Sequence, residues 1–147
     1  MKKMILGLLT LVVMSLNASE SLGTVKPLAG KKLVTVISSG EIEKAGMGMT
    51  LGLSAVNKGA DVTIVIGANA LKYALAKGDQ HQFLAKKLTH REILQKAIKN
   101  GANVYICYMC AKALGLTEKD FIKGAKIVKS LQIFNKVYEK GVRVLSF

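Results

Sequence analysis

Short runs of β-branched and aliphatic residues alternate with segments of helical periodicity, and this alternation constrains the fold more than any other feature. Three runs stand at residues 33–38, 61–66 and 103–107. Runs of this composition are typical of strands that are buried on both faces. Strands that alternate with helices predict a single α/β domain, with a mostly parallel sheet of five strands between two layers of helices.

Local signals place the elements between these strands. Helices are predicted at 45–58, where Gly59 is a suitable C-terminal residue, and at 89–99, where Thr89 and Glu92 form a capping-box pattern. Met49, Leu53 and Val56 recur at helical spacing and predict one buried face of the first helix. The remaining predictions are short helices at 70–76 and 117–123, a loop at 77–82, strands at 126–128 and 142–147, and a helix at 130–140.

The amino-terminal segment has the pattern of a secretory signal peptide. Lys2 and Lys3 precede a short apolar stretch, and Ala18 and Ser19 follow it. The stretch is too short to span a bilayer comfortably, so an uncleaved membrane anchor is the less favoured alternative. We therefore expect a periplasmic or secreted protein, with a signal peptide at 1–19, an N-terminal extension at 20–31 and the α/β domain at 32–147.

The charge is strongly basic but is not concentrated in one block. The net charge is +13, and the lysines and arginines of the domain are spread from Lys26 to Arg143. Spread lysines indicate a solvated surface that attracts anions and acidic partners. Export and the scarcity of aromatic residues argue against nucleic acid as a partner, and no membrane contact is expected once the signal is removed.

The only two cysteines, Cys107 and Cys110, form a C-x-x-C at the junction between a predicted strand and a predicted helix. Backbone N–H groups at such a junction favour the thiolate, which is the reactive form of a cysteine. Ligands of parallel α/β sheets bind beyond the carboxyl ends of the strands. Cys107 stands at such an end, as do the segments 38–40 and 67–69, so we predict that Cys107 and Cys110 form the reactive site.

The motif alone leaves four chemistries open. The pair could be an inert disulfide, a dithiol redox centre, a carrier of persulfide sulfur, or a ligand pair for a soft ion such as Cu(I). Met47, Met49 and Met109 near two strand ends favour the metal, although methionine is also a common core residue. Thioredoxin folds place a cis-proline beside the dithiol. The only proline in this chain, Pro27, precedes the first strand, so a thioredoxin fold is disfavoured.

Other catalytic patterns are weak. His81 and His90 are expected to be solvated, since His81 falls in a polar loop and His90 opens a predicted helix. The segment after the first strand carries neither a phosphate-binding P-loop nor a dinucleotide-binding glycine pattern. Nothing in the chain resembles the local signature of a serine hydrolase.

Several motifs together resemble the DsrE/DsrF-like family, which includes sulfur-relay subunits of the TusD type. The strongest is the segment 104–110 with Gly115 and Leu116 after it. Residues 59–64, 67–71 and 142–147 also resemble the family, so the likeness extends over nearly the whole region from Lys32 to Phe147.

The resemblance implies a three-layer α/β/α fold with a five-stranded parallel sheet, assembled into homo- or hetero-oligomers. It implies that Cys107 accepts and donates persulfide sulfur, with Cys110 as the second cysteine of the family's C-x-x-C branch. We therefore expect a sulfur carrier, without an organic cofactor, rather than a turnover enzyme. Its partners would be sulfur donor and acceptor proteins or small thiols, and it would form a homo-oligomer. The alternatives are a non-catalytic binding module, a Cu(I)-binding protein that uses Cys107 and Cys110, and a periplasmic dithiol redox protein.

Overall fold

Five parallel strands form one sheet in the computed structural model, which describes residues 26–83 and 87–147. The strand order is β6-β5-β2-β1-β7, and every neighbouring pair is parallel. The predicted signal peptide lies outside the described residues, as does the first half of the predicted extension. The strands are β1 (Lys32–Ile37), β2 (Asp61–Ile66), β5 (Asn103–Cys107), β6 (Ala125–Val128) and β7 (Val142–Ser146).

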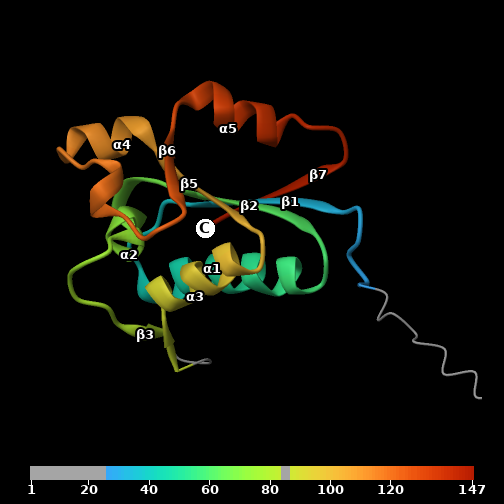
Figure 1. Cartoon of the computed structure of the whole chain (residues 1–147), viewed down its shortest axis with the longest axis horizontal. Helices are drawn as coiled ribbons and strands as arrows, with labels where there is room; N and C mark the ends of the chain where they lie inside the picture. The colour runs from blue at the N-terminus through green and yellow to red at the C-terminus, as the bar shows by residue number, and fades with distance from the viewer. Residues whose placement is uncertain (1–25, 84–86) are drawn as a thin grey trace, which may run out of the picture.

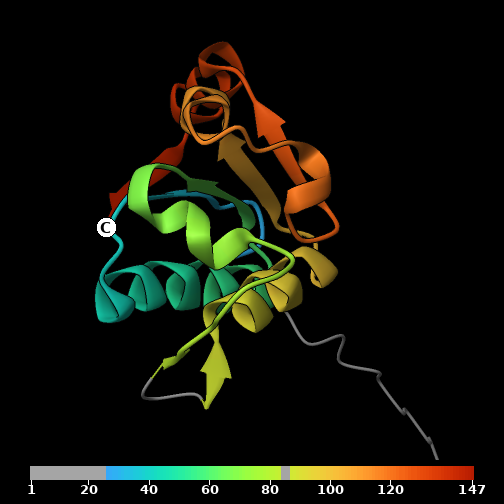
Figure 2. The same ribbon diagram turned by 90° about the vertical axis from the view of Figure 1, so that its left-hand side faces the viewer.

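Helices cover both faces of the sheet, so the predicted three-layer α/β arrangement is confirmed (Figure 1). Helices α1 (Ile42–Asn57) and α3 (His90–Lys99) lie on one face, and α4 (Tyr108–Ala113) and α5 (Ser130–Val137) lie on the other. Figure 2 looks toward the carboxyl ends of the strands, with α4 and the short helix α2 (Leu71–Ala74) in front of the sheet. Two single-turn 3₁₀ helices, η1 (Ala68–Ala70) and η2 (Glu118–Asp120), complete the helical segments that the structure describes.

The main core lies between the sheet and the α1–α3 layer. Ile64 of β2 is fully buried, and its side chain packs beneath Gly52 of α1. A Cβ atom placed on Gly52 would stand only 2.9 Å from Ile64 Cδ1, so a glycine is what allows α1 to approach the sheet this closely. Met49 and Val56 of α1 are buried and Leu53 is partly buried, as the helical spacing predicted.

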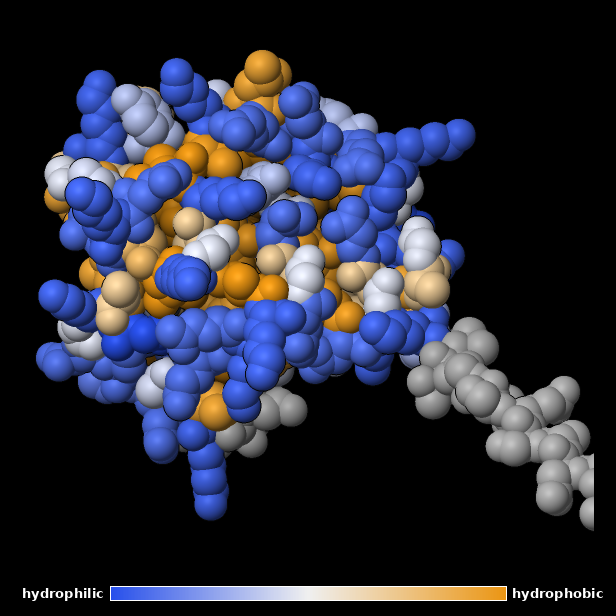
Figure 3. All heavy atoms as spheres, viewed as in Figure 1, coloured by the Kyte–Doolittle hydropathy of each residue, from blue (hydrophilic) through white to orange (hydrophobic). Residues whose placement is uncertain are grey.

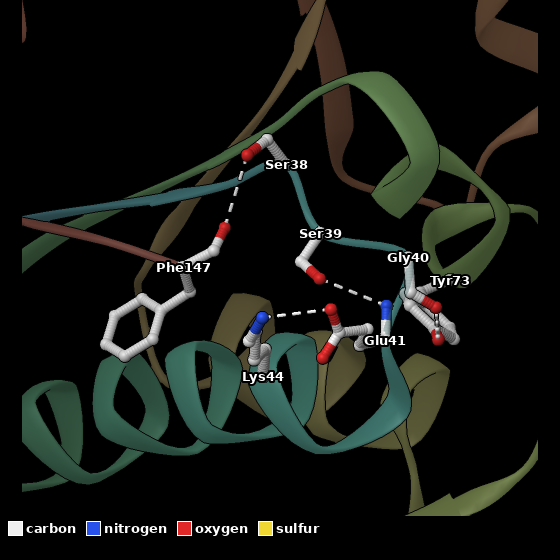
Figure 4. Close-up of polar contacts among 7 residues, drawn as sticks. All are labelled: Ser38, Ser39, Gly40, Glu41, Lys44, Tyr73 and Phe147. Atoms are coloured by element: carbon white, nitrogen blue, oxygen red, sulfur yellow. Dashed lines mark hydrogen bonds and ion pairs between the residues drawn. The ribbon is translucent and has the colours of Figure 1, made fainter.

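Helix α1 begins three residues earlier than the sequence predicted. The Ser39 hydroxyl accepts a hydrogen bond from the Glu41 N–H at 3.1 Å, and the Lys44 ammonium contacts the Glu41 carboxylate at 2.9 Å (Figure 4). These contacts organise the turn that leads into the helix. Gly46 and Gly48 lie inside α1 because aromatic rings need the space beside them: the ring of Phe83 packs on Gly46, and that of Phe147 packs on Gly48.

The capping box of α3 is confirmed. The Thr89 hydroxyl accepts a hydrogen bond from the Glu92 N–H at 3.2 Å, and the Glu92 carboxylate accepts one from the Thr89 N–H at 2.7 Å. This backbone hydrogen bond lowers the pKa of Glu92 below its usual value. The strand pair that precedes the helix, β3 (Gln82–Phe83) and β4 (Leu88–Thr89), was not predicted, because two-residue strands leave no periodic signal.

The remaining predicted boundaries differ by small amounts. The helix predicted at 70–76 is the 3₁₀ turn η1 followed by the four-residue α2, and the helix predicted at 117–123 is only η2. Helix α5 ends at Val137 rather than at residue 140. Within the residues that the structure describes, no helix combines the length and the apolar character that a membrane span requires.

Candidate thiol site

Cys107 is the last residue of β5, and Cys110 lies one helical turn further on in α4. Val104 and Ile106 of β5 are buried and pair in register with Ile64 and Ile66, whose side of the sheet faces α1. Because side chains alternate along a strand, Cys107 points to the opposite face, which α4 and α5 cover. The sequence therefore placed the cysteines correctly, at the carboxyl end of a buried strand.

The two sulfur atoms form a closely spaced pair of free thiols. Cys107 Sγ and Cys110 Sγ lie 2.9 Å apart, and the two thiols are hydrogen-bonded to each other. Both side chains are half-buried. A disulfide requires a separation of about 2.05 Å, so a small movement of the side chains would join the two atoms.

A backbone amide from a neighbouring strand end is directed at the second sulfur. The Ala68 N–H donates a hydrogen bond to Cys110 Sγ at 3.3 Å. Ala68 follows β2 and has a φ of +45°, a left-handed conformation that costs about 1 kcal/mol or more for a residue with a side chain. Backbone strain of this kind is concentrated at functional sites.

The expectation that the junction favours the Cys107 thiolate is wrong. The N–H groups of Met109 and Cys110 do lower the pKa of Cys107, as the sequence argument supposed. Burial of the sulfur and its hydrogen bond to Cys110 act in the opposite direction and outweigh them, so the pKa of Cys107 is raised above its ordinary value. The sequence could not reveal this, because burial of the sulfur depends on the tertiary fold, in which Val128 of β6 and Ile133 of α5 line the groove at Cys107.

Cys107 opens into a groove of about 280 Å³ between α4 and α5. Val128, the register partner of Cys107 on β6, lies in its wall. Cys110 is not among the residues that line it, so the groove reaches only the first sulfur. The lining residues are mostly apolar: Cys107, Tyr108, Met109, Val128, Lys129, Ser130 and Ile133.

Two ammonium groups flank the aromatic ring at the rim of this groove. Lys112 Nζ lies 5.9 Å and Lys129 Nζ lies 6.0 Å from the centre of the Tyr108 ring, within the range of cation–π attraction. Two positive charges therefore lie near Tyr108, a residue that lines the groove, and Lys129 is itself part of the groove lining.

A second, polar pocket lies beside the thiols at the same edge of the sheet. It has a volume of about 460 Å³ and is bounded by Ser39, Gly40, Glu41, Asn69 and Lys72. The fold thus brings together the predicted strand-end segments 38–40 and 67–69. The turn after β2 joins the two sites, because its Ala68 contacts Cys110 and the next residue lines the pocket.

Sequence reasoning missed the aromatic cluster that anchors this pocket, and the expectation that His90 is solvated is wrong. His90 is fully buried, and its Nε2 donates a hydrogen bond to the Ile42 carbonyl at 2.8 Å. The Tyr73 hydroxyl donates to the Gly40 carbonyl at 2.7 Å (Figure 4). The signal was available, because positions 90, 93, 94 and 97 have the spacing of one buried helix face. His81 is exposed, as predicted.

The methionines do not gather around the thiols. Met49 is fully buried in the core, whereas Met47 on α1 is 55% exposed and Met109 beside the thiols is 70% exposed. The described residues contain no cluster of three or more histidine, cysteine and carboxylate side chains. The residues that could hold a soft ion are therefore Cys107 and Cys110, with Met109 next to them.

Two known proteins are similar to this chain in sequence. An uncharacterised protein of Methanocaldococcus jannaschii is 35% identical over 85 residues, which make up 58% of this chain and 71% of the relative. One from Methanopyrus kandleri is 30% identical over 97 residues, 66% of this chain and 77% of the relative.

Solved structures share the fold at low sequence identity. The ychN protein of Escherichia coli aligns with a TM-score of 0.69 and 16% identity, over 80% of this chain and 99% of its own. A protein of unknown function from Bacteroides thetaiotaomicron aligns with a TM-score of 0.59 and 14% identity, over 80% and 95% of the two chains. The model of the DsrE/DsrF-like family matches residues 31–147, and the chain belongs to that family.

Proposed function

We propose that this protein carries reduced sulfur as a persulfide on Cys107. The Cys107 thiolate attacks the outer sulfur of a donor RS–SH, the donor's S–S bond breaks, and RS⁻ leaves. Cys107 then holds the outer sulfur as Cys–S–SH. The thiolate of an acceptor attacks that outer sulfur and takes it, and the Cys107 thiolate is regenerated. No net oxidation or reduction occurs, and the reaction is a transfer.

The observation that carries this proposal is the groove at Cys107. A persulfide adds one sulfur atom beyond Sγ, and the groove of about 280 Å³ provides room for it beside a half-buried thiol. Its apolar wall limits contact of the added sulfur with water, and the Lys112 and Lys129 ammonium groups at the rim favour an anionic donor or acceptor. Membership in a family that includes sulfur-relay proteins supports the same role.

The donor and the acceptor are proposed to be proteins or small thiols outside the cytoplasm. The basic start and short apolar stretch of the sequence support export. Sequencing the amino terminus of the protein recovered from its native cells tests this. A mature chain that begins near residue 19 or 20 is expected, and a chain that still begins at residue 1 would contradict it.

We also propose that the chain forms a homo-oligomer. Helix α5 and the residue that follows it carry exposed apolar side chains: Leu131 is 68% exposed, Phe134 52% and Tyr138 82%. Figure 3 shows apolar side chains at the surface over α5 and in a band across the molecule. Light scattering after size exclusion is expected to give a mass above that of one chain, and Phe134→Glu is expected to lower it.

The carrier role is tested by loading the reduced protein with a sulfane donor and recording the intact mass. The wild type and three variants, Cys107→Ser, Cys110→Ser and His81→Gln, are treated with cysteine persulfide in the absence of oxygen. Bound sulfane sulfur is also measured by cyanolysis. The exposed His81, which lies away from the groove, provides the matched control.

The Cys107→Ser variant is expected to take up no sulfur, whereas Cys110→Ser is expected to gain one sulfur atom. His81→Gln is expected to behave as the wild type does. Equal loading of Cys107→Ser and Cys110→Ser would contradict the assignment of Cys107. Absence of uptake in every folded variant would contradict the carrier role itself.

A further inference from the structure

We propose that Cys110 discharges the Cys107 persulfide as hydrogen sulfide, so that the protein reduces sulfane sulfur whenever no acceptor removes it. This inference rests on the proposed function, since it begins from sulfur already bound to Cys107. It assigns to the pair an activity that a carrier with a single thiol does not have. The arrangement of the two sulfur atoms, the amide at Cys110 and the groove carries it.

The first step in the argument is the distance. Cys110 Sγ lies 2.9 Å from Cys107 Sγ, so the second thiol is already in contact with the atom that it would attack. Thiolates exchange with disulfides and persulfides by attack on one of the two sulfur atoms. An approach of about 0.9 Å brings the pair to disulfide bonding distance.

The second step is direction. The groove reaches Cys107 but not Cys110, so the outer sulfur of a Cys107 persulfide would lie in the groove. Cys110 stands on the side of the β2 turn, where Ala68 contacts it. The attacking and leaving sulfur atoms are thus on different sides of Cys107 Sγ, and displacement at sulfur requires this geometry.

The third step is charge. The Ala68 N–H donates a hydrogen bond to Cys110 Sγ at 3.3 Å, so a backbone donor faces the attacking sulfur. On the opposite side, the Lys112 and Lys129 ammonium groups stand near the groove rim and favour the departure of an anion. The attacking sulfur therefore accepts a backbone hydrogen bond, and the leaving sulfur departs near two positive charges.

The chemistry balances. The Cys110 thiolate attacks Cys107 Sγ, the Cys107–S–SH bond breaks, and HS⁻ leaves with the two electrons of that bond. The sulfane sulfur is reduced to sulfide, while the two protein thiols are oxidised to a disulfide. Overall, RS–SH and the dithiol yield RSH, H₂S and the Cys107–Cys110 disulfide. An external dithiol must reduce this disulfide before the next cycle.

The test combines sulfide trapping with intact mass on the full protein, anaerobically and with one equivalent of cysteine persulfide. The wild type is expected to release one sulfide per chain and to end two hydrogen atoms lighter than the reduced protein. Cys110→Ser is expected to release none and to end one sulfur atom heavier. Addition of a dithiol is expected to restore the wild type for a second equal release.

Two results separate this inference from the carrier role. Wild type that retains the sulfur, releases no sulfide and so matches Cys110→Ser would overturn the inference while leaving the carrier role intact. Failure of Cys110→Ser to gain sulfur would instead remove the persulfide from which the inference begins. A mixed disulfide with the donor on Cys110→Ser would overturn it as well, because the donor's inner sulfur would then have been attacked. Cys110→Ala replaces Cys110→Ser if circular dichroism shows that the serine variant is unfolded.

Discussion

The imidazole of His90 stacks on the phenol ring of Tyr73, with ring centroids 4.0 Å apart and planes inclined by 19°. His90 comes from α3 and Tyr73 from α2, so the stacked pair joins two helices that follow different strands. The Tyr73 hydroxyl also donates a hydrogen bond to the carbonyl of Gly40, which precedes α1, and His90 Nε2 donates one to the carbonyl of Ile42, the first residue of α1. The pair therefore holds the wall of the polar pocket in place.

Replacement of His90 is expected to weaken the fold measurably. His90→Phe keeps an aromatic ring but removes the hydrogen bond to the Ile42 carbonyl, and the loss of such a bond costs about 0.5–1.5 kcal/mol. Urea unfolding followed by circular dichroism measures the loss. His81→Gln, at an exposed position, is the control and is expected to unfold with the wild-type midpoint. Equal midpoints for His90→Phe and the wild type would contradict a structural role for the buried ring.

Gly52→Ala is expected to destabilise the protein although alanine is the better helix former. The added methyl group would meet Ile64 Cδ1 at 2.9 Å and Cγ1 at 3.0 Å, and Ile64 is fully buried and cannot swing aside. Overpacking of a core costs about 1–3 kcal/mol. Met47→Ala, at a 55% exposed position of the same helix, should leave the urea midpoint near its wild-type value. A midpoint for Gly52→Ala at or above that of the wild type would show that α1 can move away from the sheet.

Narrowing the groove is expected to slow sulfur uptake selectively. Ser130 is exposed at the start of α5 and lines the groove, so Ser130→Tyr inserts a ring there without disturbing the core. Loading by a bulky persulfide such as glutathione persulfide should slow at least tenfold, and loading by inorganic hydrodisulfide should change less. Ser130→Ala is the matched small substitution and should load at the wild-type rate. Equal slowing with both donors would point to a loss of folding instead.

Alkylation of Cys107 is expected to require alkaline conditions. Burial and the contact with Cys110 raise the pKa of the Cys107 thiol above its ordinary value of 9.0. At pH 9 the thiol is therefore still mainly neutral, and the thiolate fraction continues to grow at higher pH. The rate with iodoacetamide, located by fragment mass spectrometry, should therefore continue to rise above pH 9. Cys110→Ala removes the contact but not the burial, so its profile should move to lower pH. A plateau near neutral pH in the wild type would contradict this assignment.

The buried strands could be predicted from the sequence because their composition is dictated by burial on both faces. β1, β2 and β5 therefore stand within a residue of the predicted positions. Helix α1 was predicted to begin at residue 45, three residues too late, although the predicted range already contained Gly46 and Gly48. The contacts at its start are local, from Ser39 to Glu41 and from Glu41 to Lys44, and the sequence analysis did not use them.

The thiol site was predictable in location but not in electrostatics. The strand-to-helix junction fixed where Cys107 lies, and its local N–H groups act in the expected direction. Other elements supply the remaining contacts. Val128 and Ile133 line the groove at Cys107, and the Ala68 N–H donates a hydrogen bond to Cys110 Sγ. Pairings between elements that are remote along the chain were beyond sequence reasoning.

The hydrogen bond from Ala68 to Cys110 spans 42 residues of chain and exists only while β2 and β5 lie side by side. The reactivity of the Cys110 thiol therefore depends on the pairing of these two central strands. Separation of β2 from β5 near Ala68 would change the reactivity of the Cys110 thiol before the secondary structure unfolds.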